Sequence, residues 1–209
     1  VKSVEKINND FIIVGTSFYA FKMRLKDLQI VDTIWRERCT KVFYQNNKYY
    51  IGTLTGLYEV REDKTYTYLG DLHPALGRRI TDIKSAPDGT IWITTSDNGI
   101  VAYKNNKVIK VITYDDGLSS NICKTLFIKG EALWVGTDKG INKINTNNGK
   151  FSIIKYSTSD GLPSNTINAL YVKDSIVWVG SPAGLTYFNE NSISNSSICN
   201  LQMLGIYVS

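Results

Sequence analysis

Apolar residues in this chain form short runs separated by polar turns, and the runs repeat. The clearest run reads ALWVGT at residues 132–137 and is followed by Asp-Lys-Gly and a second apolar run. Similar phrases occur five times in the 209 residues, at 12–23, 49–60, 91–103, 132–144 and 176–187. A phrase that returns at a nearly fixed spacing is typical of a repeat protein.

Aromatic residues mark the repeat. Trp92, Trp134 and Trp178 take the same place in three phrases, and Tyr50 takes it one repeat earlier. The period of about 40–45 residues suits the four-stranded blade of a β-propeller, and also paired-helix repeats. The runs are rich in Ile, Val, Thr, Tyr and Trp, which favour strands, and no stretch has helical periodicity long enough for an ordinary helix. The sequence therefore predicts an all-β fold of about five four-stranded propeller blades.

The fourth repeat shows the expected order of strands, at residues 122–128, 132–137, 141–145 and 151–156. The second strand is apolar at nearly every position, which predicts burial on both faces. Because side chains alternate along a strand, Trp134 and Gly136 share a face, and the missing side chain of Gly136 lets the neighbouring blade approach closely. Gly140 is expected to supply the positive φ of a hairpin turn.

The other repeats carry the same motif with local departures. Its expected structural residues are Trp92, Trp134 and Trp178, with Gly52, Gly136 and Gly180 in second strands and Gly56, Gly99, Gly140 and Gly184 in turns. Tyr19 replaces the turn glycine in the first repeat, and Gly99 lies one residue late in the third. Those two hairpins are expected to differ from the others.

Composition and charge narrow the classes of function. The net charge is +5, but Lys and Arg form small groups scattered over different repeats, whereas nucleic-acid-binding proteins gather them on one face. No run of 18 apolar residues could span a membrane. The three cysteines lack the spacing of metal ligands and there is one histidine, so we expect no nucleic acid, metal or cofactor.

Catalytic chemistry is sparse in the sequence. His73 precedes Pro74 in a loop. It is the only residue in the sequence that could serve as the catalytic histidine of a propeller lyase. The adjacent Asp115 and Asp116 are typical of turn capping. No phosphate-binding glycine motif or serine nucleophile elbow is present. We therefore expect this fragment not to be an enzyme.

A ligand site is expected at the mouth of the central channel, where loops before first strands and after second strands converge. Its candidate residues are His73, Arg78, Arg79, Asp97, Asn98, Asn121, Lys124 and Asn165, together with Trp35 and Arg36 from the connection before the second repeat. Polar side chains and aromatic faces of these kinds hold sugars. Asn121 and Asn165 recur with the motif, however, which favours a role in tying loops by hydrogen bonds.

The phrase DGL-x-S-N followed by LWVGT resembles the two-component regulator propeller repeat. Residues 116–121 and 133–137 carry it in the fourth repeat, and residues 160–165 and 177–181 carry it in the fifth. The second and third repeats keep the strand core without DGL, and the first is the weakest copy. The resemblance extends from about residue 2 to residue 190.

The resemblance implies a function and a setting. In that family such repeats form the extracytoplasmic sensing region of bacterial hybrid histidine kinases, and many members sense polysaccharide fragments. It implies a periplasmic module of a dimeric inner-membrane receptor that detects an oligosaccharide or another small ligand. Binding would signal across the membrane to control transcription, through kinase and membrane segments outside this chain. A protein-interaction scaffold and, further from the pattern, a propeller lyase or hydrolase are the competing functions.

The resemblance also bears on domain organisation. We expect propeller repeats over residues 1–193, with blades at 1–35, 36–76, 77–118, 119–162 and 163–193. Family propellers usually have more than five blades, so these are expected to belong to a ring of seven or eight, although a closed five-bladed ring stays open. Residues 194–209 are either a last outer strand or the start of a following β-sandwich domain.

Overall fold

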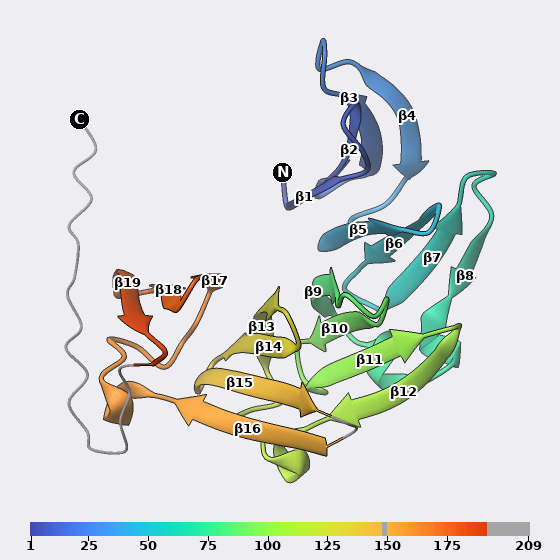
Figure 1. Cartoon of the computed structure of the whole chain (residues 1–209). Coiled ribbons are helices and arrows are strands. Elements are labelled where there is room, and N and C mark those ends of the chain that lie inside the picture. The colour runs from blue at the N-terminus through green and yellow to red at the C-terminus, as the bar shows by residue number, and fades with distance from the viewer. Residues whose placement is uncertain (148–149, 192–209) are drawn as a thin grey trace.

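The computed structural model describes residues 1–147 and 150–191, which form five antiparallel sheets arranged as an arc (Figure 1). The segment 194–209, expected as an outer strand or the start of a sandwich domain, lies outside the described residues, as do Asn148 and Gly149 of one expected turn. Within the described residues, no helix is long and apolar enough to cross a membrane. The predicted all-β propeller architecture is confirmed.

Each sheet is built from strands that follow one another in the chain and pair antiparallel. The first two sheets contain β1 (Ser3–Lys6), β2 (Phe11–Gly15), β3 (Ala20–Arg24) and β4 (Ile30–Trp35), then β5 (Lys41–Gln45), β6 (Lys48–Gly52), β7 (Leu57–Arg61) and β8 (Tyr66–Tyr68). The third and fourth contain β9 (Ile80–Ser85), β10 (Ile91–Thr95), β11 (Ile100–Lys104) and β12 (Lys107–Ile112), then β13 (Cys123–Lys129), β14 (Ala132–Thr137), β15 (Gly140–Asn147) and β16 (Lys150–Tyr156). The fifth contains β17 (Ala169–Lys173), β18 (Ile176–Ser181) and β19 (Gly184–Asn189).

The first strand of each sheet faces the centre of the arc, and the last described strand lies at the rim (Figure 1). The first strands of consecutive sheets contact one another, from β1 to β5, β9, β13 and β17. Short 3₁₀ helices occur in the connections between sheets, namely η1 (Leu69–Asp71), η2 (Pro74–Gly77), η3 (Tyr114–Asp116) and η4 (Thr158–Asp160). The inner wall of the arc is therefore made of five segments far apart in the sequence.

Large side chains of the second strands fill the spaces between sheets. Trp134 of β14 is completely buried and shares an apolar cluster with Ile167, just before the fifth sheet, and with Leu170 of β17. Trp92 of β10 packs in the same way against the fourth sheet. Trp178 of β18 is only partly buried, because no described sheet follows it. Trp92 and Trp134 thus belong to the interface with the next sheet, as the repeat predicts.

Glycine beside the large side chain allows the next sheet to come close, which confirms the prediction for Gly136. A Cβ added to Gly136 would lie 2.6 Å from Cγ2 of Ile167. One added to Gly52 would lie 2.8 Å from Cβ of Ile80. At Gly180 the closest atom is Cβ of Ala169, 3.2 Å away in the same sheet. Where a sheet follows, an apolar side chain of the next repeat therefore packs into the space beside this glycine.

The turns after the second strands share one hydrogen bond. Oγ1 of Thr137 donates to the carbonyl of Gly140 over 2.8 Å, and Gly140 has a φ of 109°. The expected differences at Tyr19 and Gly99 are small. Thr16 makes the same bond to Tyr19 at 2.8 Å without a positive φ, and Thr95 makes it to Gly99 at 3.0 Å around a loop one residue longer.

Replacing Gly136 by alanine tests the packing between sheets. We expect Gly136→Ala to lower the free energy of unfolding by about 1–3 kcal/mol, since the new methyl group overlaps Ile167. Gly180→Ala is the matched control at the equivalent position and is expected to cost less, because the new methyl group would lie 3.2 Å from Cβ of Ala169, a milder overlap than the 2.6 Å contact with Ile167. Guanidinium unfolding curves measure both. Equal losses would contradict the packing described here.

Candidate ligand site at the channel mouth

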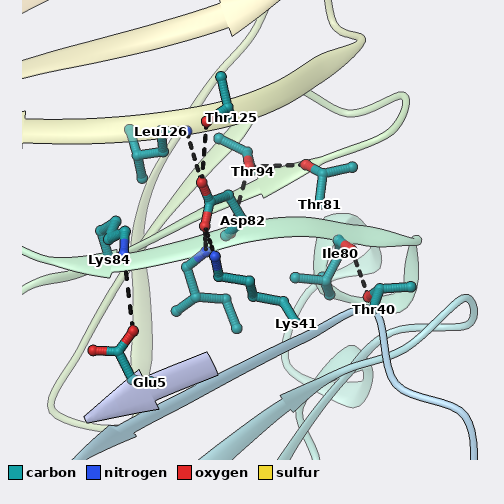
Figure 2. A network of polar contacts seen from close by, with 11 residues as sticks. Glu5, Thr40, Lys41, Ile80, Thr81, Asp82, Lys84, Thr94, Thr125 and Leu126 are labelled. Atoms are coloured by element: carbon teal, nitrogen blue, oxygen red, sulfur yellow. Dashed lines mark hydrogen bonds and ion pairs between the residues drawn. The ribbon is translucent and has the colours of Figure 1, made fainter. Parts of the chain in front are cut away.

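Polar residues occupy one equivalent position in three of the first strands. Lys41 of β5, Asp82 of β9 and Thr125 of β13 stand opposite Gly52, Thr94 and Gly136 of their respective second strands. They therefore occupy the same place in three consecutive sheets. Figure 2 shows the side chains of Lys41 and Thr125 next to the Asp82 carboxylate.

Asp82 joins three sheets through its carboxylate, although only 5% of the residue is exposed. Oδ1 accepts from Nζ of Lys41 at 2.7 Å and from the N–H of Ile83 at 2.9 Å. Oδ2 accepts from the N–H of Leu126 at 2.9 Å and, more weakly, from Oγ1 of Thr125 at 3.4 Å. Each oxygen of the carboxylate therefore has two donors. This buried carboxylate links neighbouring first strands and has no lone pair free to act as a catalytic base.

Further contacts extend the network along the inner wall (Figure 2). Oγ1 of Thr40 donates to the carbonyl of Ile80 at 2.7 Å, which links the second sheet to the third. Glu5 of β1 lies 3.8 Å from Nζ of Lys84 on β9. Burial raises the pKa of Glu5 above its usual value, and the attraction of Lys84 opposes that rise. The network therefore reaches from the first sheet to the fourth.

An open hollow of about 320 Å³, here called the channel-mouth pocket, lies at one end of this wall. Its lining residues come from the first strands of the third and fourth sheets and from nearby connections: Thr40, Arg79, Ile80, Thr81, Ser96, Ile122, Cys123, Lys124 and Asn168. Nζ of Lys124 donates to Oδ1 of Asn168 at 3.0 Å, which bridges the fourth and fifth sheets. Arg79 and Lys124 are thus the two predicted ligand residues that line the channel-mouth pocket.

The predicted residues near Arg79 point to other partners. Nδ1 of His73 accepts from the N–H of Ala75 at 3.1 Å and caps η2. Arg78 forms an exposed ion pair with Asp97 at 3.8 Å. The Nδ2 of Asn98 also donates to Asp97, at 3.1 Å. None of these four side chains lines the channel-mouth pocket.

Asn121 and Asn165 tie loops together, as the recurrence of the motif predicts. Oδ1 of Asn165 accepts from the N–H of Thr158 at 2.8 Å, and its carbonyl accepts from the N–H of Gly140 at 2.7 Å. Asn121 makes the equivalent bonds, to Tyr114 at 2.7 Å and to Gly99 at 3.0 Å. Each asparagine fastens its own connection to the turn of the preceding sheet.

Trp35 and Arg36 lie at a separate site on the rim. Trp35 is the last residue of β4 rather than part of a connection, and its ring packs against Tyr58 at 4.7 Å and Tyr66 at 5.6 Å between centroids. An open groove of about 410 Å³ runs beside it. The groove is lined by Asp32, Thr33, Ile34, Trp35, Arg36, Glu37, Val60, Lys64 and Tyr66. The ten predicted residues therefore do not form one site.

The sequence interpretation missed Asp82, Lys41, Thr40, Thr81 and Asn168. A signal for Asp82 was present, because ITDIKS places an acid between two isoleucines of a first strand that should be mostly apolar. Aligning the first strands of all repeats would have placed Asp82 beside Lys41. Among residues 1–147 and 150–191, no group of three or more His, Cys, Asp or Glu side chains could hold a metal ion.

Comparisons with known proteins rest on structure, since no family model and no curated protein matches this sequence. The extracellular domain of the hybrid two-component system BT3049 from B. thetaiotaomicron is 18% identical with a TM-score of 0.74, over 96% of this chain and 29% of that one. The extracellular domain of the one-component system BT4673 from the same organism is 16% identical with a TM-score of 0.71, over 91% and 29%.

A propeller of different origin is also similar. The β-propeller domain of Cps50 (Swd1) from Myceliophteria thermophila is 12% identical with a TM-score of 0.71, over 92% of this chain and 70% of that one. This chain spans 29% of the length of each of the two bacterial domains. At these identities the likeness is one of fold: the described residues form β-propeller blades, and the extracellular domains of BT3049 and BT4673 are among the structures that they resemble.

Replacing Asp82 by asparagine tests the network. We expect Asp82→Asn to lower the free energy of unfolding by about 3–5 kcal/mol, because it leaves the mostly buried Lys41 ammonium without its counter-charge. Asp97→Asn, which breaks an exposed pair, is the control and should change stability by less than about 1 kcal/mol. Adding Lys41→Gln to Asp82→Asn should recover part of the loss. Similar unfolding curves for the two single variants would contradict the role of Asp82.

Proposed function

We propose that this chain is a non-catalytic sensing module that binds an oligosaccharide at the channel-mouth pocket. The observation that carries the proposal is the origin of the lining, which comes from strands of the third and fourth sheets and from the connections that lead into the second and fifth. A ligand there would contact several blades at once. The similarity in fold to the extracellular domain of the hybrid two-component system BT3049 supports this assignment.

The chemistry of the pocket suits a hydroxyl-rich ligand. Thr40, Thr81 and Ser96 contribute hydroxyl groups, and Asn168 contributes an amide that both donates and accepts. Asn168 is exposed and Lys124 is partly exposed, so both remain within reach of a ligand. Sugar hydroxyl groups need such paired donors and acceptors when they leave water.

Binding can signal only if the ligand prefers one of two arrangements of the receptor. A ligand that contacts several sheets would favour the arrangement in which their first strands are held together. In our proposal the module belongs to the periplasmic side of a dimeric inner-membrane receptor. Segments outside this chain would supply the membrane passage, the histidine kinase and the control of transcription.

The proposed receptor contains a propeller of seven or eight blades. The outer face of the fifth sheet supports this, because Tyr171 is 52% exposed and Trp178 occupies the place that elsewhere packs against a following sheet. A further blade would cover these rings as the fifth sheet covers Trp134. The lyase alternative is less well supported, because the only histidine caps a 3₁₀ helix outside the pocket.

Calorimetry with the extracytoplasmic part of the full-length protein tests the proposed function. We expect one class within a broad panel of neutral and acidic oligosaccharides to bind, and Asn168→Ala to weaken that binding about tenfold by removing a hydrogen-bonding side chain. Asn9→Ala is the control, because Asn9 lies on an exposed turn of the first sheet and does not line the pocket. It should leave the affinity unchanged.

Two outcomes would contradict the proposal. A folded protein that binds no member of the panel would exclude a direct oligosaccharide sensor. A stable protein partner recovered in its place, without any ligand-dependent rise in melting temperature, would favour the scaffold function.

A further inference from the structure

The charged residues that line the channel-mouth pocket are all positive. Of its nine lining residues, Arg79 and Lys124 are cationic and none is acidic. A neutral sugar would need hydroxyl and amide groups, which the pocket also has, but it would leave both cations without a counter-charge. The lining therefore carries information about the ligand beyond its hydroxyl groups.

The two cations are placed to act together. Arg79 immediately precedes β9 and Lys124 is the second residue of β13, so they flank the hollow from the third and fourth sheets. The carbonyl of Arg79 accepts from the N–H of Ser96 at 3.0 Å, which fixes the backbone while the exposed side chain stays available. Nζ of Lys124 is oriented by Asn168, a neutral partner that leaves its charge uncompensated.

Two carboxylates near the pocket are committed to other partners. Asp97 pairs with Arg78, and Asp82 is saturated by Lys41 and two backbone N–H groups. Burial, with the nearby charge of Asp138, raises the pKa of the Cys123 thiol to about 12. Oδ1 of Asp138 is buried without a hydrogen-bond partner in the described part of the chain, and Asp138 is not among the lining residues of the pocket. Within the described residues, Arg79 and Lys124 therefore face the pocket without an acidic partner on its lining.

We propose that the ligand of the channel-mouth pocket is an anionic oligosaccharide whose carboxylate or sulfate groups are held by Arg79 and Lys124. The guanidinium group of arginine presents parallel N–H donors that match two oxygens of such a group. Lysine adds a second charge from the neighbouring sheet. This inference rests on the proposed function and specifies the chemical class of the ligand.

A glycan array followed by calorimetry tests the inference. The array carries uronate-containing, sulfated and neutral oligosaccharides, and the uronates are also present as their neutral methyl esters. We expect binding to the acidic glycans and at least tenfold weaker binding to the neutral counterparts, since a charged hydrogen-bonded pair is lost. The uronate and sulfate arms distinguish the two sources of the negative charge.

Matched variants locate the effect. Arg79→Gln and Lys124→Gln should each weaken binding of the acidic glycan about tenfold or more. Arg78→Gln removes the same charge one residue away, outside the lining, and should change affinity less than about twofold. Raising NaCl from about 50 to 500 mM should weaken the wild type and have little effect on the Arg79→Gln/Lys124→Gln double variant. Unchanged melting temperatures would show that all variants are folded.

The failures are distinguishable. Equal binding of acidic glycans and neutral counterparts, or unchanged affinity in Arg79→Gln and Lys124→Gln, would overturn the inference and leave the sensing function standing. An array without any bound glycan would overturn both.

Discussion

The structure depends on how closely consecutive sheets approach at their second strands. A large side chain such as Trp134 fills the space between two sheets, and the glycine two residues later leaves room for an apolar side chain of the next sheet. In the first, second and fourth sheets this close approach also brings a backbone N–H of the next sheet to the carbonyl of the threonine after the glycine, at 2.9–3.2 Å. Burial and hydrogen bonding therefore reinforce each other along the arc.

The interface between the third and fourth sheets uses a different solution. Thr94 stands where the other second strands have glycine, and its buried hydroxyl group accepts from Oγ1 of Thr81 at 2.8 Å. The link between the two sheets is supplied instead by Asp82, whose carboxylate accepts the N–H of Leu126. The polar network thus lies at the interface that departs from the repeat, directly beside the residues that line the channel-mouth pocket.

The fold could be predicted from the sequence because the same pattern of strands and turns recurs in each repeat. The second strand of the fourth repeat has the expected bounds, and the roles of Gly136 and Gly140 follow from strand alternation and turn geometry. The site was harder to predict, because a pocket lined by two sheets and several connections depends on how segments distant in the sequence meet. Arg79 and Lys124 were predicted as candidates from their places at the start of first strands and do line the pocket, whereas Asp82 was missed because its partners lie on two other sheets. Trp35 was misplaced because the first repeat is shorter than the others.

Hydrogen exchange at the amide of Leu126 tests most directly whether the first strands are tied side by side. This amide lies on the innermost strand of its sheet and donates to the Asp82 carboxylate at 2.9 Å. NMR should find it as slow to exchange as amides within the sheet, and Asp82→Asn should accelerate it far more than the amide of Val135 on β14. Rapid exchange of Leu126 in the wild-type protein would contradict a wall of first strands held together by Asp82.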